Sequence, residues 1–112
     1  MQYREEINFD EALELVRSDA TVYAFVNNIG ELEFLKEMLN SKDVLSIDLD
    51  EAREIVMCSI EGTLPSIDVK KYEHSIVVCP HGKTSLKFIR SLSVFNITAH
   101  SLKGGTEGLR MR

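Results

Sequence analysis

The chain has few cysteines, no long apolar run and no excess of basic residues. Two cysteines, Cys58 and Cys79, are too few among 112 residues for a disulfide scaffold or for a zinc site of CxxC pairs. The longest apolar runs, residues 22–26 and 76–79, fall far short of the roughly 18 to 20 residues that cross a bilayer. Four acidic residues within the first 11 positions interrupt the apolar block that a secretion signal needs. We therefore expect a soluble, cytoplasmic protein with free thiols, no membrane partner and a single domain over residues 1–112.

The formal net charge of −5 argues against a nucleic-acid partner, because binding to the phosphate backbone needs concentrated Lys and Arg. This charge is unevenly distributed along the chain. Residues 1–69 carry five basic and 16 acidic side chains, a net charge of −11, whereas residues 70–112 carry eight basic and two acidic ones, a net charge of +6. We expect the acidic segment to present solvated helix faces and the basic segment to attract a small anion.

Runs of β-branched and aromatic residues predict four strands, at residues 21–26, 44–47, 75–79 and 97–102. Asn27, Asn28 and Gly30 predict a turn after the first of them. The strands alternate with helical patterns, and parallel neighbours are usually joined by helical crossovers. The sequence therefore predicts an α/β protein with a mostly parallel sheet, in which ligands gather beyond the carboxyl ends of strands.

Apolar residues at helical spacing predict helices between these strands. Asn8 with Glu11, and likewise Asp48 with Glu51, have the spacing of a capping box, which marks a helix N-terminus. The first predicted helix covers residues 9–17, and the second carries Ile29, Leu32, Leu35 and Leu39 on a common side. The third follows Asp48 and contains Ala52, Ile55, Val56 and Ser59. The fourth runs from Leu86 through Leu92.

Residues 79–85, CPHGKTS, join a predicted strand to a predicted helix. Such a turn aims successive backbone N–H groups at one point and adds the positive end of the helix dipole, so Cys79 would lie in an anion-binding cradle that favours the thiolate. Lys83 and His81 would add positive charge, and Gly82 permits the positive φ that a tightly curled loop requires. These neighbours favour a nucleophilic Cys79 over the alternative, a small buried hydrophobe that ends a core strand.

CPHGKT, residues 79–84, resembles the active-site loop of the rhodanese family of sulfurtransferases. The family's loop is a six-residue turn that begins at a cysteine, with glycine at its fourth position and arginine, threonine or a similar residue at its sixth. Ser85 follows where the family commonly has serine or threonine. Leu102, Lys103, Gly104 and Gly105 resemble the leucine and glycine pair that end the family's next strand. The resemblance implies a rhodanese-like α/β fold, with a mostly parallel central sheet of about four to five strands and helices on both faces.

The resemblance also implies sulfur transfer through a persulfide of Cys79. The thiolate would take the outer sulfur of a small anionic donor such as thiosulfate and pass it to a thiol or cyanide-type acceptor, with no cofactor and no metal. Loop amides would stabilise the anionic sulfur and Lys83 would hold the donor. Thr84 and Ser85 would donate hydrogen bonds to the persulfide or to donor oxygens. The candidate site is thus the nucleophile Cys79 with the substrate-binding residues His81, Gly82, Lys83, Thr84 and Ser85.

A catalytically silent rhodanese-like binding or regulatory module is the main alternative. Val26, Asn27 and Asn28 replace an aspartate-valine-arginine motif of the family, and its histidine-isoleucine-proline-glycine motif has no counterpart. Pro80 replaces a frequent basic residue after the cysteine. The physiological donor and acceptor and the oligomeric state stay open.

Other anion-binding or metal-binding sites fit the sequence less well. GKTS resembles the end of a Walker A loop, but Val77 stands where that pattern needs glycine. Cysteine phosphatases place arginine six positions after the cysteine, where this chain has Ser85. Zinc ligation by Cys58, Cys79 and His81 would lack a fourth ligand. The residues interpreted as structural are His74, His100 and Cys58.

Overall fold

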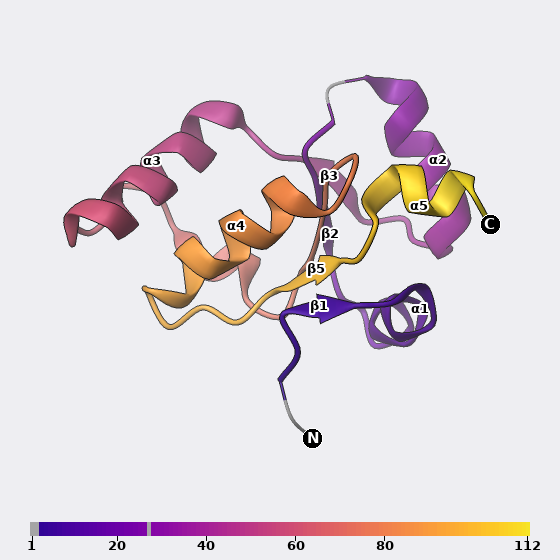
Figure 1. The fold of residues 1–112 in the computed structure, drawn as a ribbon, viewed down its shortest axis with the longest axis horizontal. Coiled ribbons are helices and arrows are strands. Elements are labelled where there is room, and N and C mark those ends of the chain that lie inside the picture. Colours follow the sequence, from indigo (N-terminus) through magenta and orange to yellow (C-terminus); the bar gives the residue numbers. More distant parts are fainter. Residues whose placement is uncertain (1–2, 27) are drawn as a thin grey trace.

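A parallel β-sheet occupies the centre of the molecule (Figure 1). The computed structural model describes residues 3–26 and 28–112, and within them the sheet has five strands in the order β1-β5-β4-β2-β3, with all four neighbouring pairs parallel. The predicted α/β fold with a mostly parallel sheet of four to five strands is confirmed. The strands are β1 (Glu6–Ile7), β2 (Val22–Ala24), β3 (Val44–Ser46), β4 (Ile76–Val78) and β5 (His100–Leu102).

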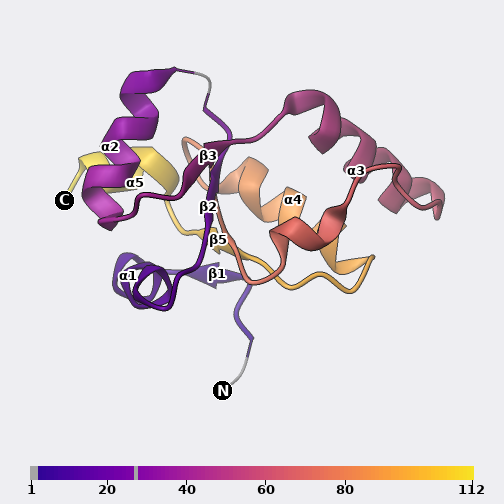
Figure 2. The ribbon, with the colours of Figure 1, turned by 180° about the vertical axis from the view of Figure 1, so that it is seen from behind.

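Helices cover both faces of the sheet, as the views from the two sides show (Figures 1 and 2). They are α1 (Phe9–Arg17), α2 (Ile29–Leu39), α3 (Leu49–Glu61), the 3₁₀ helix η1 (Val69–Tyr72), α4 (Lys83–Ser93) and α5 (Gly105–Arg110). α1, α2 and α5 share one apolar cluster with Ile76 and Val78 of β4, whereas α3, α4 and η1 share another with Val77. Neighbouring β4 residues enter different clusters because side chains alternate across a strand. None of the described helices is both long and apolar enough to cross a bilayer.

Side-chain caps begin the helices at which the sequence shows a capping pattern. Asn8 caps α1 in a complete capping box, because its Oδ1 accepts from Glu11 N at 2.8 Å and its own N donates to Glu11 Oε1 at 3.0 Å. Asp48 caps α3 and accepts from Glu51 N at 3.2 Å. The second box is incomplete, because the Glu51 carboxylate accepts from Lys71 Nζ instead of reaching back to the cap.

Several element boundaries differ from the sequence prediction. α4 begins at Lys83, not near Leu86, because Gly82 starts the helix in the left-handed conformation without a side-chain cap that a pattern would reveal. Ile29 does not share the buried side of α2, since it stands at the first position of the helix and is 76% exposed. The strands are shorter than the predicted runs, and the sequence patterns do not predict β1, η1 or α5. The predicted turn residue Asn27 lies outside the described residues.

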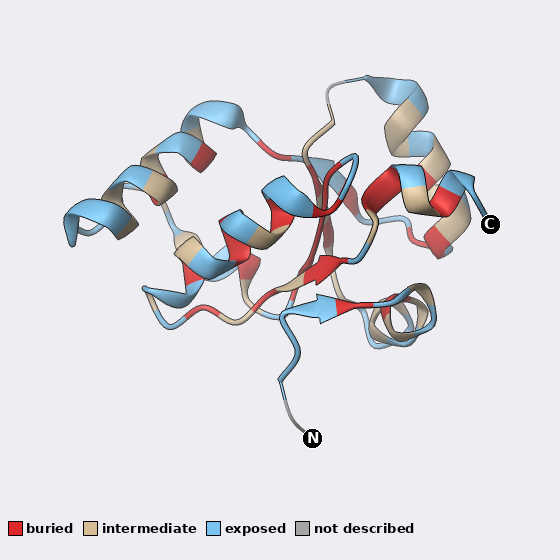
Figure 3. Cartoon of the chain, in the orientation of Figure 1, coloured by how far each residue is buried: buried red, intermediate tan, exposed pale blue. Residues whose placement is uncertain are grey.

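β4 lies in the middle of the sheet, at the point where the chain changes direction across it. The connection after β2 leads outward to β3, whereas the connection after β4 leads to β5 on the other side. Ligand sites of open parallel sheets lie at the carboxyl ends of strands at such a point. Buried residues concentrate along the strands and the inner sides of the helices (Figure 3), and after β4 the burial extends through Cys79 before Pro80 and His81 become exposed.

Candidate functional site

Cys79 directly follows β4 and opens the short loop to α4. Pro80 and His81 are exposed, and Gly82 has φ 86° and ψ 0°, in the left-handed region that favours glycine. α4 begins at the next residue, Lys83. The chain therefore reverses within residues 80–82 and places the first turn of α4 beside Cys79.

Two main-chain amides and one hydroxyl contact the Cys79 sulfur. Gly82 N and Ser85 N donate to Sγ at 3.1 and 3.3 Å, and the thiol donates to Ser85 Oγ at 3.3 Å. Both amides belong to the N-terminus of α4, whose dipole and unpaired N–H groups favour an anion. Cys79 is only 1% exposed, yet neither apolar cluster of the core includes it. The sulfur is thus enclosed by polar groups rather than by aliphatic side chains alone.

A second buried serine, Ser101, extends these hydrogen bonds into the sheet. Its Oγ lies 2.6 Å from Ser85 Oγ and 3.5 Å from the Gly82 carbonyl oxygen, to which it donates. Both serines are fully buried. Ser101 lies in β5 opposite Val77 of β4, and it is not among the site residues that the sequence predicts. Its only sequence signal is its position just before Leu102 and the glycine pair in a predicted buried strand.

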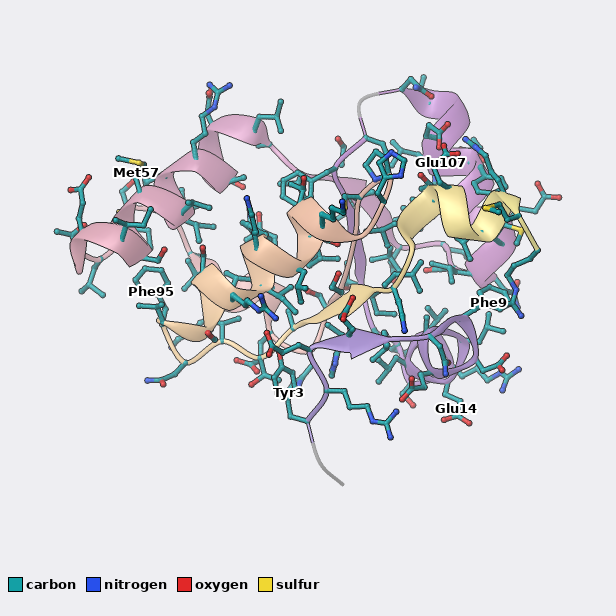
Figure 4. All side chains as sticks on the ribbon, viewed as in Figure 1. Tyr3, Phe9, Glu14, Met57, Phe95 and Glu107 are labelled. Atoms are coloured by element: carbon teal, nitrogen blue, oxygen red, sulfur yellow. The ribbon has the colours of Figure 1, made fainter. Side chains whose placement is uncertain are left out.

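The glycine pair brings α5 against the other side of the Cys79 loop. Thr106 N donates to the Cys79 carbonyl oxygen at 3.1 Å, and Glu107 N donates to the Pro80 carbonyl oxygen at 2.9 Å. Figure 4 labels Glu107 on α5, the helix that lies beside this loop. A Cβ at Gly105 would lie 1.9 Å from the Cys79 carbonyl oxygen, so a larger residue there would force the backbone to shift. The glycine pair therefore allows α5 to approach the Cys79 loop closely enough to hydrogen-bond its carbonyl groups.

The predicted site residues fall into a buried and an exposed group. Cys79, Gly82 and Ser85 are buried, whereas His81, Lys83 and Thr84 are exposed. Ser85 is predicted to donate hydrogen bonds to a persulfide or to donor oxygens, and in the structure it contacts the Cys79 sulfur itself and has no exposed surface. The exposed group lies on the solvent side of the same loop.

Ion pairs between the two segments of the chain neutralise part of their charge asymmetry. Three basic residues of the segment 70–112 pair with carboxylates of the segment 1–69, and the pairs are Arg90–Glu5, Arg110–Glu31 and Lys71–Glu51. In the part of the chain that the structure describes, no carboxylate lies within 4.0 Å of Lys83 Nζ. The positive charge beside Cys79 is therefore not cancelled by an ion pair.

His74, His100 and two surface hollows lie apart from the Cys79 loop. His74 and His100 line a hollow with Glu73 and Asp19, and a second hollow lies beside the end of α2; Cys79 lines neither. His100 Nδ1 lies 2.7 Å from the Arg4 carbonyl oxygen. Among residues 3–26 and 28–112, no group of three or more His, Cys, Asp or Glu side chains is placed to hold a metal ion.

Comparison with known proteins identifies the fold. No protein-family model and no curated protein matches the chain. A rhodanese-related protein from Thermoplasma volcanium matches with a TM-score of 0.62 at 21% identity, over 96% of this chain and 92% of that one. The human single-domain sulfurtransferase matches with a TM-score of 0.57 at 15% identity, over 97% and 98%. The chain therefore has the rhodanese-like fold, as the resemblance of its cysteine loop and glycine pair implies.

Proposed function

We propose that the protein is a sulfurtransferase that moves sulfane sulfur from a small anionic donor to a thiol or cyanide-type acceptor through a persulfide of Cys79. The observation that carries this proposal is the pair of N–H groups, from Gly82 and Ser85, that donate to Cys79 Sγ. Fixed donors of this kind stabilise negative charge without having to rearrange during the reaction. The similarity in fold to a human sulfurtransferase supports the same class of reaction.

Both half-reactions keep one negative charge on sulfur at this site. In the first, the Cys79 thiolate attacks the outer sulfur of a donor such as thiosulfate, the S–S bond of the donor breaks, and sulfite leaves with the bonding electron pair. In the second, an acceptor such as cyanide attacks the outer sulfur of the persulfide, and thiocyanate leaves while the thiolate is regenerated. The amides of Gly82 and Ser85 therefore act in both steps.

The exposed side of the loop is proposed to bind the donor. Within the described ranges 3–26 and 28–112, no carboxylate pairs with Lys83, and the neighbouring residues His81 and Thr84 are exposed. Because Cys79 is 1% exposed, the donor reaches Sγ only after a local movement of the protein around this residue. Donor binding is thus assigned to the exposed loop residues, and access to the sulfur requires a separate movement.

Intact-mass measurement tests the proposal. Reduced protein is incubated with thiosulfate, freed of excess reagent and weighed. We expect the mass to rise by one sulfur atom and to return to its starting value after cyanide, with release of thiocyanate. Cys79→Ser should gain no sulfur, whereas Cys58→Ser, which removes the half-buried thiol of α3, should behave as the unmodified chain. An unchanged mass after thiosulfate and other sulfane donors contradicts the proposal and favours a binding module.

A further inference from the structure

We propose that Ser101 is a positioning residue for Cys79, with a role in turnover that rests on the sulfurtransferase function proposed above. Ser101 touches no sulfur atom itself and acts through Ser85, whose Oγ lies 2.6 Å away. A hydroxyl in a fully buried strand position is unfavourable unless it is hydrogen-bonded. Both hydrogen-bond partners of Ser101, Ser85 and Gly82, contact the Cys79 sulfur. The position of Ser101 is therefore tied to this site rather than to the packing of β5.

With a protonated thiol, the hydrogen bonds run outward from the sulfur. Cys79 donates to Ser85 Oγ at 3.3 Å, Ser85 donates to Ser101 Oγ at 2.6 Å, and Ser101 donates to the Gly82 carbonyl oxygen at 3.5 Å. A serine hydroxyl carries one proton, so each side chain in this series can donate only once. The last bond lies at the long limit of hydrogen-bond geometry and contributes little.

Loss of the thiol proton reverses the donors and acceptors in the hydrogen bonds that link Cys79, Ser85 and Ser101. The Ser85 hydroxyl turns to donate to the sulfur anion, which leaves its oxygen free to accept, and the Ser101 hydroxyl turns from Gly82 to Ser85. A hydroxyl that donates to an anion becomes a better acceptor, so the 2.6 Å bond strengthens when the sulfur is charged. Ser101 thereby holds Ser85 as a third donor to the charged sulfur, beside the two amides.

Alkylation of Cys79 by iodoacetamide measures this effect without any sulfur donor. Tryptic peptides separate the two thiols, because residues 72–83 contain Cys79 and residues 54–70 contain Cys58. We expect Ser101→Ala to slow alkylation of Cys79 at pH 7 about three- to tenfold, the size of one ordinary hydrogen bond. The difference between the rates should shrink as the pH rises. Ser75→Ala is the matched control, because Ser75 is also buried but donates to the Tyr72 carbonyl oxygen.

A second pair of variants separates the effect of the hydroxyl at position 101 from the effect of altered packing. Thr and Val have nearly the same shape, so Ser101→Thr and Ser101→Val disturb the buried position alike and differ in the hydroxyl. We expect Ser101→Thr to alkylate several-fold faster than Ser101→Val at pH 7. The charged groups around the loop, His81, Lys83, Lys103 and Glu107, are the same in all these variants, so they cannot produce the difference.

The outcomes distinguish this inference from the proposed function. Equal rates for Ser101→Ala and the unmodified chain, or for the Thr and Val variants, overturn the role of Ser101 even if a persulfide forms at Cys79. A slower Ser101→Ala with no uptake of sulfur from any donor supports the role of Ser101 and contradicts the sulfurtransferase proposal. Absence of native-state alkylation at Cys79 in the unmodified chain contradicts both.

Discussion

Gly105→Ala tests how closely α5 holds the Cys79 loop. The added Cβ would lie 1.9 Å from the carbonyl oxygen of Cys79 and 2.7 Å from the carbonyl carbon and oxygen of Pro80. These are backbone atoms, which cannot turn aside as the end of a flexible side chain does. The substitution should therefore push α5 away from the loop and break the hydrogen bonds from Thr106 N and Glu107 N to the loop carbonyls.

The expected loss of stability has two sources. Gly105 has φ 60°, and this left-handed conformation costs a residue with a side chain about 1–2 kcal/mol. Each broken hydrogen bond removes about 0.5–1.5 kcal/mol more. The total, about 2–5 kcal/mol, is a large part of the roughly 5–15 kcal/mol by which domains of this size are stable.

Equilibrium unfolding in urea measures this loss, with Gly62→Ala as the matched control. Gly62 has φ 76°, but nothing lies within 4 Å of a Cβ built there. The control therefore carries the conformational cost alone, about 1–2 kcal/mol. Equal losses for the two variants would refute the reasoning, because the contact between Gly105 and the Cys79 carbonyl would then have no energetic consequence.

Three further predictions concern the donor, a helix cap and a buried tyrosine. Lys83→Ala should raise the donor KM and flatten its dependence on ionic strength, while the exposed control Lys42→Ala leaves both unchanged; unaltered kinetics would remove Lys83 from the donor site. Asn8→Ala should lower the free energy of unfolding in urea by about 1 kcal/mol, and a negligible loss would contradict the capping box. Burial, with the nearby Glu51 carboxylate, raises the pKa of Tyr72 well above its usual value, so its contribution to stability is complete below about pH 10 and is lost above it. Tyr72→Phe should make the alkaline fall in unfolding free energy less steep, and an identical fall would contradict this.

Local patterns in the sequence predict the parts of the fold that depend on neighbouring residues. The cap at Asn8 and the buried strand β4 follow from residues within a few positions of each other. β1 was beyond such reasoning, because its two residues form a strand only through pairing with Ser101 and Leu102, far along the chain. α5 was equally hidden, since it begins at a glycine pair that a sequence pattern interprets as the end of structure.

Local sequence patterns likewise predict only the part of the candidate site that lies within the Cys79 loop. The loop of residues 79–85 carries its own pattern, and its amides do face the Cys79 sulfur. Ser101 has no such local pattern, because its contact with Ser85 depends on β5 lying beside β4. The charge asymmetry of the sequence is only partly neutralised by folding, because Lys71, Arg90 and Arg110 pair with carboxylates of the segment 1–69. The expectation that the segment 70–112 attracts a small anion stays a prediction, and Lys83 is the basic residue that lies in the Cys79 loop region at the start of α4.

Sulfur transfer at Cys79 depends most on the amides of Gly82 and Ser85, which we propose hold the charged sulfur. Nuclear magnetic resonance of ¹⁵N-labelled protein observes these two amide protons directly, before and after loading with thiosulfate. We predict that both resonances shift on loading and return after cyanide, and that neither moves in Cys79→Ser. Uptake of sulfur by Cys79 with both resonances unchanged would contradict the claim.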